Sequence, residues 1–201
     1  AMVISALGVA TTFAFGRRCI GRAGGVVAAL AFGLMPPVFY HSHLACFDMP
    51  IAAMWLFVVY AYHRSLAPSL PWALACAVLY GLALDTKHNA WYLPPALIAH
   101  AAALHLVPLV RRFWRGAGRV PSAEQESAPR AKRAPVPWAI ALMVVLGPLV
   151  FYALWPWIWN DTWGRLGEYA RFHLQHVYYN MEYLGTTYFR PPFPRSYAWL
   201  M

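Results

Sequence analysis

Apolar residues along this chain occur in long blocks that are separated by short polar or basic breaks. The blocks cover roughly residues 1–16, 23–40, 50–62, 71–86, 91–110 and 137–156. Uninterrupted apolar blocks predict membrane-spanning helices rather than half-buried strands, in which apolar and polar residues would alternate. We therefore expect an all-α, polytopic transmembrane helix bundle, with about five spans in residues 1–110 and a sixth span at 137–156.

Several of these blocks are shorter than a membrane span requires. A helix rises about 1.5 Å per residue, so about 20 residues are needed to cross about 30 Å of hydrocarbon. The block 50–62 falls furthest below this length. A span at this position must include flanking residues or lie where the membrane is thin.

The composition separates this chain from soluble proteins. Hydrophobic residues make up 61% of the chain and charged residues only 11%, whereas a globular protein has about half and about a quarter. A soluble fold would also have to hide ten Trp, twelve Tyr and eleven Phe in one core. The net charge of +9 does not indicate a nucleic-acid partner, because the basic residues form clusters between the apolar blocks, as in cytoplasmic membrane loops.

The Lys and Arg residues predict the orientation in the membrane. When the breaks are assigned alternately to the two sides, one side receives eleven of the sixteen basic residues: Arg17, Arg18, Arg22, Arg64, Arg111, Arg112, Arg115, Arg119, Arg130, Lys132 and Arg133. Cytoplasmic loops carry such an excess, so this side is expected to be cytoplasmic. The break 111–136 lacks an apolar period and is interpreted as a basic, flexible cytoplasmic loop.

The opposite side receives three polar stretches, residues 41–50, residues 85–89 and the region after Trp155. In that last region, apolar residues recur at spacings of three and four: Trp163, Leu166, Ala170, Leu174, Val177 and Met181. This spacing predicts an amphipathic helix, which we expect to lie along the outer membrane interface with several Trp residues at its start. The proline-rich tail from Tyr188 is expected to be extended, so residues 157–201 form an extracytoplasmic interfacial helix and tail.

Asp48 is the first residue that could carry chemistry. A partly desolvated carboxylate at the membrane edge can accept a proton from a hydroxyl or position a cation. Because Pro50 follows closely, Asp48 is also a candidate helix N-cap. From Asp48 alone, the N-cap interpretation is favoured over a catalytic role.

Lys87 is the second candidate and belongs to five successive polar residues, 85–89, in an otherwise lipid-compatible stretch. A lysine can bind a phosphate, and the phosphate of an outward-facing lipid carrier would lie at this depth. Alternatively, Lys87 extends toward the lipid headgroups with Asp85 as its local partner. The sequence does not decide between these two interpretations.

Two groups of side chains offer imidazole and carboxylate ligands for a divalent metal ion. The first is His41 and His43 with Asp48, and the second is His173 and His176 with Glu182. Neither spacing is specific, so interfacial hydrogen bonding is favoured and no metal ligand is assigned. The three cysteines form no C-x-x-C pair and predict neither a disulfide framework nor a thiolate metal site.

Together these motifs resemble the polytopic glycosyltransferases that use lipid-phosphate-linked sugars, such as the dolichyl-phosphate-mannose protein mannosyltransferases and the bacterial relatives that glycosylate lipid A. The resemblance covers most of the chain. It rests on HSHLACFDMP at 41–50, on GLALDTKHNAWYLP at 81–94, and on PWIWNDTW at 156–163 before an aromatic, His-rich helix.

This resemblance implies an inverting transferase in a bacterial inner membrane, surrounded by membrane lipids, with its active face outward. A polyprenyl-phosphate sugar would be the donor, and a protein or lipid would be the acceptor. Asp48 matches the second-loop acid of the family and is the candidate catalytic residue, while the candidate substrate-binding residues are Lys87, His88, His43 and Arg190. The principal acidic loop of the family lies between its first two spans, and we expect this chain to begin after that loop.

A transporter or channel subunit is the main alternative, because outward acids and a membrane-edge lysine also suit an ion or solute path. Transporters usually place ionisable groups near the middle of the membrane. Here the centres of the predicted helices contain almost none. A non-catalytic membrane scaffold is a further alternative, which would leave Asp48 and Lys87 without a common cavity.

Overall fold

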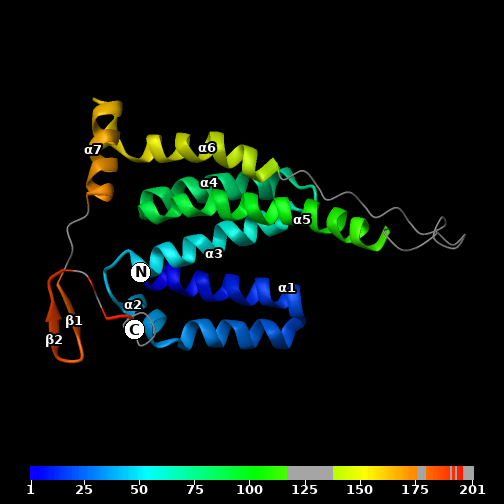
Figure 1. The fold of residues 1–201 in the computed structure, drawn as a ribbon, viewed down its shortest axis with the longest axis horizontal. Coiled ribbons are helices and arrows are strands. Elements are labelled where there is room, and N and C mark those ends of the chain that lie inside the picture. Colours follow the sequence, from blue (N-terminus) through cyan, green and yellow to red (C-terminus); the bar gives the residue numbers. More distant parts are fainter. Residues whose placement is uncertain (117–137, 176–179, 191, 193, 197–201) are drawn as a thin grey trace, which may run out of the picture. The chain divides into compact units, whose positions relative to one another are not determined.

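The computed structural model describes residues 1–116, 138–175, 180–190, 192 and 194–196. The chain divides into two compact units, Ala1–Trp155 and Pro156–Met201. The first unit consists of helices, and the second contains two short helices and a β-hairpin among its described residues (Figure 1). The predicted all-α membrane bundle is therefore confirmed for the larger part of the chain.

Helix α1, Met2–Leu34, is folded back on itself at Gly21, which has φ 86° and ψ 179°. Its two limbs lie side by side, because a Cβ on Gly33 would come within 3.3 Å of Val9, and a Cβ on Gly16 within 3.0 Å of the Gly25 Cα. The first limb contains the predicted block 1–16. The second limb contains the first part of the predicted block 23–40. The basic break between these blocks forms the turn.

Helix α2, Pro36–His43, and helix α3, Asp48–Ser65, follow and make an angle of 113° with each other. The predicted block 23–40 does not form one helix, because α1 ends at Leu34 and Pro36 begins α2. A proline has no backbone N–H for a helical hydrogen bond and fits the first position of a new helix. The bend after α2 places its end beside the start of α3.

The remaining helices of this unit are α4 (Leu70–Thr86), the 3₁₀ helix η1 (His88–Tyr92), α5 (Leu93–Gly116) and α6 (Trp138–Leu154). Helix α4 packs between α3 and α6, and the buried core of this unit contains several small residues. These include Ala61, Ala73, Cys76, Ala77, Ala83 and Ala139. Small side chains let helix backbones approach closely, which is how membrane helices associate without a hydrophobic driving force between them.

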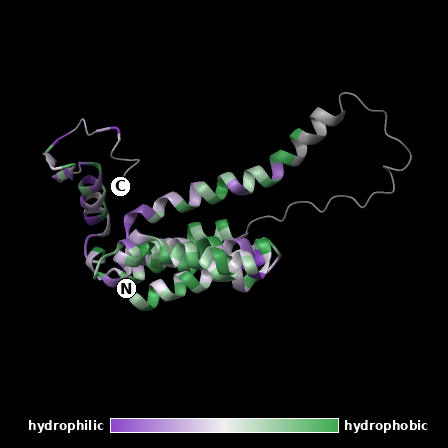
Figure 2. Cartoon of the chain, turned by 90° about the horizontal axis from the view of Figure 1, so that it is seen from below, coloured by the Kyte–Doolittle hydropathy of each residue, from purple (hydrophilic) through white to green (hydrophobic). Residues whose placement is uncertain are grey.

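By length and composition, two helices among the described residues could cross a membrane, Met2–Leu34 and His88–Val107, and the bent pair α2 and α3 would make a third. Because α1 is folded back at Gly21, each of its limbs is shorter than the whole helix. Helices α4 and α6 are apolar but shorter. The outside of the bundle is also apolar, and Val3, Val27 and Leu149 are 74%, 66% and 57% exposed. Figure 2 shows apolar residues along most helices of this unit, as expected for a multi-pass membrane protein.

The second unit contains η3 (Pro156–Ile158), α7 (Thr162–Leu174), and strands β1 (Met181–Tyr183) and β2 (Thr186–Tyr188). The prediction of a helix that continues to Met181 was wrong, because Met181 begins β1 and pairs with Tyr188. Leu184 and Gly185 both have positive φ, at 48° and 77°, which is typical of a two-residue type I′ hairpin turn. Val177 of the predicted period lies outside the described residues.

Candidate active site

The bend between α2 and α3 brings several polar side chains together at one end of the bundle. Asp48 is the first residue of α3, and His41 lies in the last turn of α2. The Nδ1 atom of His41 lies 3.8 Å from Oδ2 of Asp48 and 3.5 Å from Sγ of Cys46. Phe47 is the N-cap of α3, so the alternative that Asp48 caps this helix is wrong.

Asp48 also contacts Lys87, which follows the last residue of α4. The Lys87 Nζ donates a hydrogen bond of 2.6 Å to Oδ1 of Asp48. One of the two open interpretations gave Lys87 a local partner in Asp85, but the ion pair joins two helix ends that are 39 residues apart. The Asp48 side chain is 51% exposed and the Lys87 side chain 35%, so both are accessible from solvent.

This contact favours the charged form of Asp48, which precedes the apolar block 50–62. The hydrogen bond from Lys87 is the largest cause that lowers the pKa of Asp48 below its ordinary value. The charges of Lys87 and His41 act in the same direction, and partial burial opposes them. The carboxylate is therefore ionised at neutral pH and can accept hydrogen bonds or protons.

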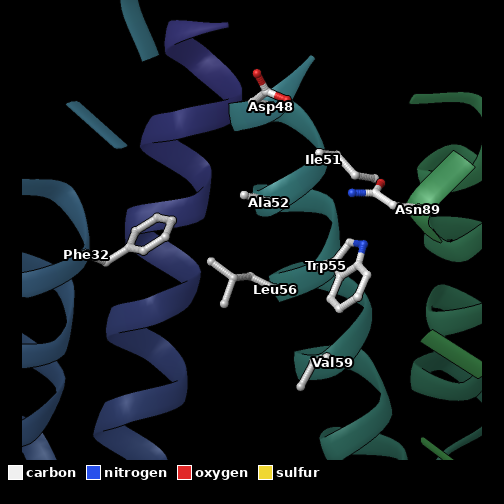
Figure 3. Close-up of a pocket in the computed structure, with 8 residues that line it drawn as sticks. All are labelled: Phe32, Asp48, Ile51, Ala52, Trp55, Leu56, Val59 and Asn89. Atoms are coloured by element: carbon white, nitrogen blue, oxygen red, sulfur yellow. The ribbon is translucent and has the colours of Figure 1, made fainter. Parts of the chain in front are cut away.

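A mostly apolar cavity of about 540 Å³ extends from Asp48 along α3. Its lining consists of Phe32, Asp48, Ile51, Ala52, Trp55, Leu56, Val59 and Asn89. Figure 3 shows Asp48 at one end of this lining and Val59, three helical turns further along α3, at the other. Lys87 is not part of the lining, but it bonds to Asp48, and Asn89 of η1 lies two residues after it.

Two polar atoms of the cavity lining lack a hydrogen-bond partner in the part of the chain that the structure describes. They are the indole N–H of Trp55 and Oδ1 of Asn89, and both are buried. A buried donor or acceptor without a partner costs about 1–3 kcal/mol. A ligand with hydroxyl groups in this cavity could satisfy both atoms.

The other predicted substrate-binding residues, His43, His88 and Arg190, are not among the residues that line the cavity. His43 is exposed, its Nδ1 is 2.7 Å from the Phe39 carbonyl of its own helix, and its ring packs on the Phe39 ring. His88 begins η1 directly after Lys87. Arg190 is exposed in the second unit, so its role at this site stays a prediction.

The second predicted metal group is only partly described. His176 lies outside the described residues, Glu182 is exposed in β1, and the His173 ring packs edge-on against the ring of Tyr169. In the same unit, Asp161 caps α7 by accepting a hydrogen bond of 3.1 Å from the Gly164 N–H. No common site of these residues can be built.

The sequence analysis missed Cys46, Trp55 and Asn89 as members of the site. Cys46 was expected to belong neither to a disulfide nor to a thiolate metal site, and Trp55 lies within an apolar block where aromatic residues are expected. Asn89 belongs to the polar stretch 85–89, which was a usable signal. Its position in the cavity depends on the turn through η1, which the sequence pattern does not show.

Comparison with known protein families gives a match over the first part of the chain. Residues 1–117 match the family described as dolichyl-phosphate-mannose-protein mannosyltransferase, and this is more than half of the 201 residues. No curated protein and no solved structure matches the sequence. The match includes α1 to α5 and every residue of the site around Asp48, and it confirms the resemblance inferred from the motifs.

Proposed function

Because the chain belongs to the dolichyl-phosphate-mannose-protein mannosyltransferase family, which consists of glycosyltransferases, we propose that it moves a sugar from a polyprenyl-phosphate donor to an acceptor hydroxyl. The reaction takes place at the end of the bundle that carries Asp48 and Lys87. The ion pair between these residues at the mouth of an apolar cavity is the observation that supports this proposal most. The acceptor is a protein or a lipid on the extracytoplasmic side.

Asp48 and Lys87 take complementary roles in an inverting transfer. When the donor binds, its phosphate attracts Lys87, and the Oδ1 atom of Asp48 that Lys87 had bonded becomes available to the acceptor. Asp48 takes the proton of the acceptor hydroxyl while the acceptor oxygen bonds to the anomeric carbon. The bond from that carbon to the phosphate oxygen breaks, its electron pair stays on the phosphate, and Lys87 stabilises the negative charge.

The cavity binds the part of the donor next to the phosphate. Its apolar wall along α3 suits the first isoprene units of the lipid. The unpartnered Trp55 N–H and Asn89 Oδ1 can bond sugar hydroxyls, one as donor and the other as acceptor. The bound donor would thereby lie with its phosphate toward Lys87.

The test is sugar transfer by the full-length protein from a polyprenyl-phosphate-linked hexose, compared between wild type and Asp48→Asn. Asparagine keeps the shape of the side chain but cannot accept the proton, so we expect kcat to fall by about 10²–10⁴-fold. Asp85→Asn is the matched control, because it makes the same change two residues from Lys87 and outside the cavity lining. Equal turnover by wild type and Asp48→Asn would remove Asp48 from the mechanism.

A further inference from the structure

We propose that His41, Cys46 and Asp48 form a three-ligand site for a zinc ion at the bend between α2 and α3. Each residue offers one ligand atom, and these three atoms lie within 4.8 Å of one another. The three positions fall within eight residues of sequence. They come together because α2 and α3 meet at 113°.

The distances fit the size of a zinc ion. Zinc binds imidazole nitrogen at about 2.0–2.1 Å and thiolate sulfur at about 2.3 Å, so two such ligands at a tetrahedral angle lie about 3.5 Å apart. The distance from His41 Nδ1 to Cys46 Sγ is 3.5 Å, and the distance to Asp48 Oδ2 is 3.8 Å. The third pair, Cys46 and Asp48, lies within 4.8 Å, so binding one ion requires these two side chains to move closer together.

The kinds of ligand select zinc over the hard cations. Magnesium and calcium prefer sites made of oxygen ligands, whereas one nitrogen, one sulfur and one carboxylate oxygen suit zinc. Cys46 gives up its thiol proton on binding, and the thiolate and the carboxylate together balance the charge of the ion. Three protein ligands leave a fourth position open to water or another oxygen ligand.

Lys87 does not compete with the metal for the same oxygen of Asp48. It donates to Oδ1, while the oxygen that faces His41 is Oδ2. The hydrogen bond therefore orients the carboxylate and leaves the ligand oxygen available, as partners of metal ligands commonly do. His43 is not a member of this cluster, and its Nδ1 faces the Phe39 carbonyl.

The test uses the full-length protein, purified in detergent, freed of metal with a chelator and titrated with Co²⁺. We expect a cobalt–thiolate charge-transfer absorption band that saturates at one ion per chain and disappears when Zn²⁺ displaces the cobalt. Cys46→Ser should abolish the band, and His41→Ala should weaken cobalt binding at least tenfold. Cys19→Ser is the matched control and should keep the band, because Cys19 is exposed and lies at the Gly21 turn, away from α2.

Wild-type protein without a thiolate band, or a band that survives Cys46→Ser, would overturn the zinc site. The thermal unfolding temperature of each variant in detergent separates loss of the ligand from loss of the fold. This measurement needs no sugar donor. Its failure is therefore distinguishable from failure of the proposed transferase function, which Asp48→Asn tests by turnover.

Discussion

Asp48 divides its carboxylate between two neighbours, since Oδ1 accepts a hydrogen bond from Lys87 and Oδ2 faces His41. Lys87 is the largest cause of the lowered pKa of Asp48. A carboxylate with a lowered pKa stays ionised to a lower pH than usual. If Asp48 is the base, transfer activity is retained as the pH falls until this lowered pKa is reached.

Lys87→Met should therefore change the pH profile as well as the rate. Methionine keeps an apolar stem but removes the charge, so the pKa of Asp48 should rise toward its ordinary value. We expect the acid limb of kcat/KM against pH to move to higher pH, with at least a tenfold loss of activity at neutral pH. Lys87→Arg keeps the charge and is the control. An acid limb that stays in place in Lys87→Met contradicts the assignment of Asp48 as the base.

Gly21 is required by the backbone of α1 rather than by packing. Its φ of 86° and ψ of 179° lie in a region that is essentially restricted to glycine. A Cβ at this position would meet nothing within 4 Å, so any effect of Gly21→Ala comes from backbone strain. We expect this substitution to lower the free energy of unfolding in detergent by about 1–3 kcal/mol.

Gly167→Ala is the matched control for this change. Gly167 lies inside α7, and a Cβ there also meets nothing within 4 Å. Alanine is favoured over glycine in a helix, so this variant should be as stable as wild type or slightly more stable. Equal unfolding free energies for the wild type and Gly21→Ala would show that the turn of α1 is not strained by a side chain.

At the level of helices, α4 and α6 meet at two glycines that leave no room for larger residues. A Cβ on Gly147 would overlap the ring of Tyr80, and a Cβ on Gly81 would come within 2.9 Å of the Gly147 carbonyl oxygen. Because the clashing atoms include an aromatic ring and backbone, neither neighbour can move away easily. The close approach of the two helices therefore depends on both glycines.

Gly147→Ala should separate α4 from α6 and destabilise the bundle by about 1–3 kcal/mol, the usual cost of overpacking. The measurement is the free energy of unfolding in detergent, with Gly167→Ala as the same substitution in open space. Helix propensity alone would make Gly147→Ala more stable. A stabilised Gly147→Ala variant would therefore show that the two helices do not pack as closely as described.

The sequence predicted the helices well where an apolar block was bounded by clear breaks. Blocks 50–62 and 71–86 correspond to α3 and α4, because long apolar segments in a membrane have few alternatives to a helix. The prediction was wrong after Leu174, where spacings of three and four continued through Met181 into a strand. Six apolar positions at helical spacing are weak evidence for a helix when the segment is exposed. The hairpin turn at Leu184-Gly185 favours a strand there instead.

The candidate site was predictable in its residues but not in its contacts. Asp48 and Lys87 were identified because charged residues at the ends of apolar blocks are costly near the membrane and are often functional. Their direct pairing depends on how α3 and α4 pack, and the sequence left Asp85 open as an alternative partner of Lys87. Cys46 joins His41 only through the bend between α2 and α3, which no spacing rule encodes.

At the scale of the first unit, the two ends of the bundle differ in charge. The Gly21 turn and the end of α3 lie at one end, where the rings of Phe15 and His63 are 5.0 Å apart (Figure 1). This end carries four basic residues: Arg17, Arg18, Arg22 and Arg64. The ion pair of Asp48 and Lys87 lies at the opposite end of α3 and α4. This arrangement agrees with alternate threading of the chain through the membrane.

If the basic end is cytoplasmic, two positions of the chain should react on opposite sides of the membrane. Cys19 is exposed beside Arg17 and Arg18, and Phe47, 68% exposed, lies directly before Asp48. The experiment compares single-cysteine variants of the full-length protein in intact cells, one with Cys19 and one with Phe47→Cys. We expect a membrane-impermeant maleimide to label position 47 from outside and to label Cys19 only after the membrane is permeabilised.

The variant that keeps only Cys76 is the negative control. Cys76 is a fully buried residue of α4 and should stay unlabelled in both conditions. Labelling of Cys19 in intact cells with position 47 protected would reverse the orientation. The Asp48 site would then face the cytoplasm, where a donor presented from outside could not reach it. The side of the membrane on which transfer occurs thus depends on the four arginines at the basic end. They hold that end in the cytoplasm, and Asp48 at the other end then faces outward.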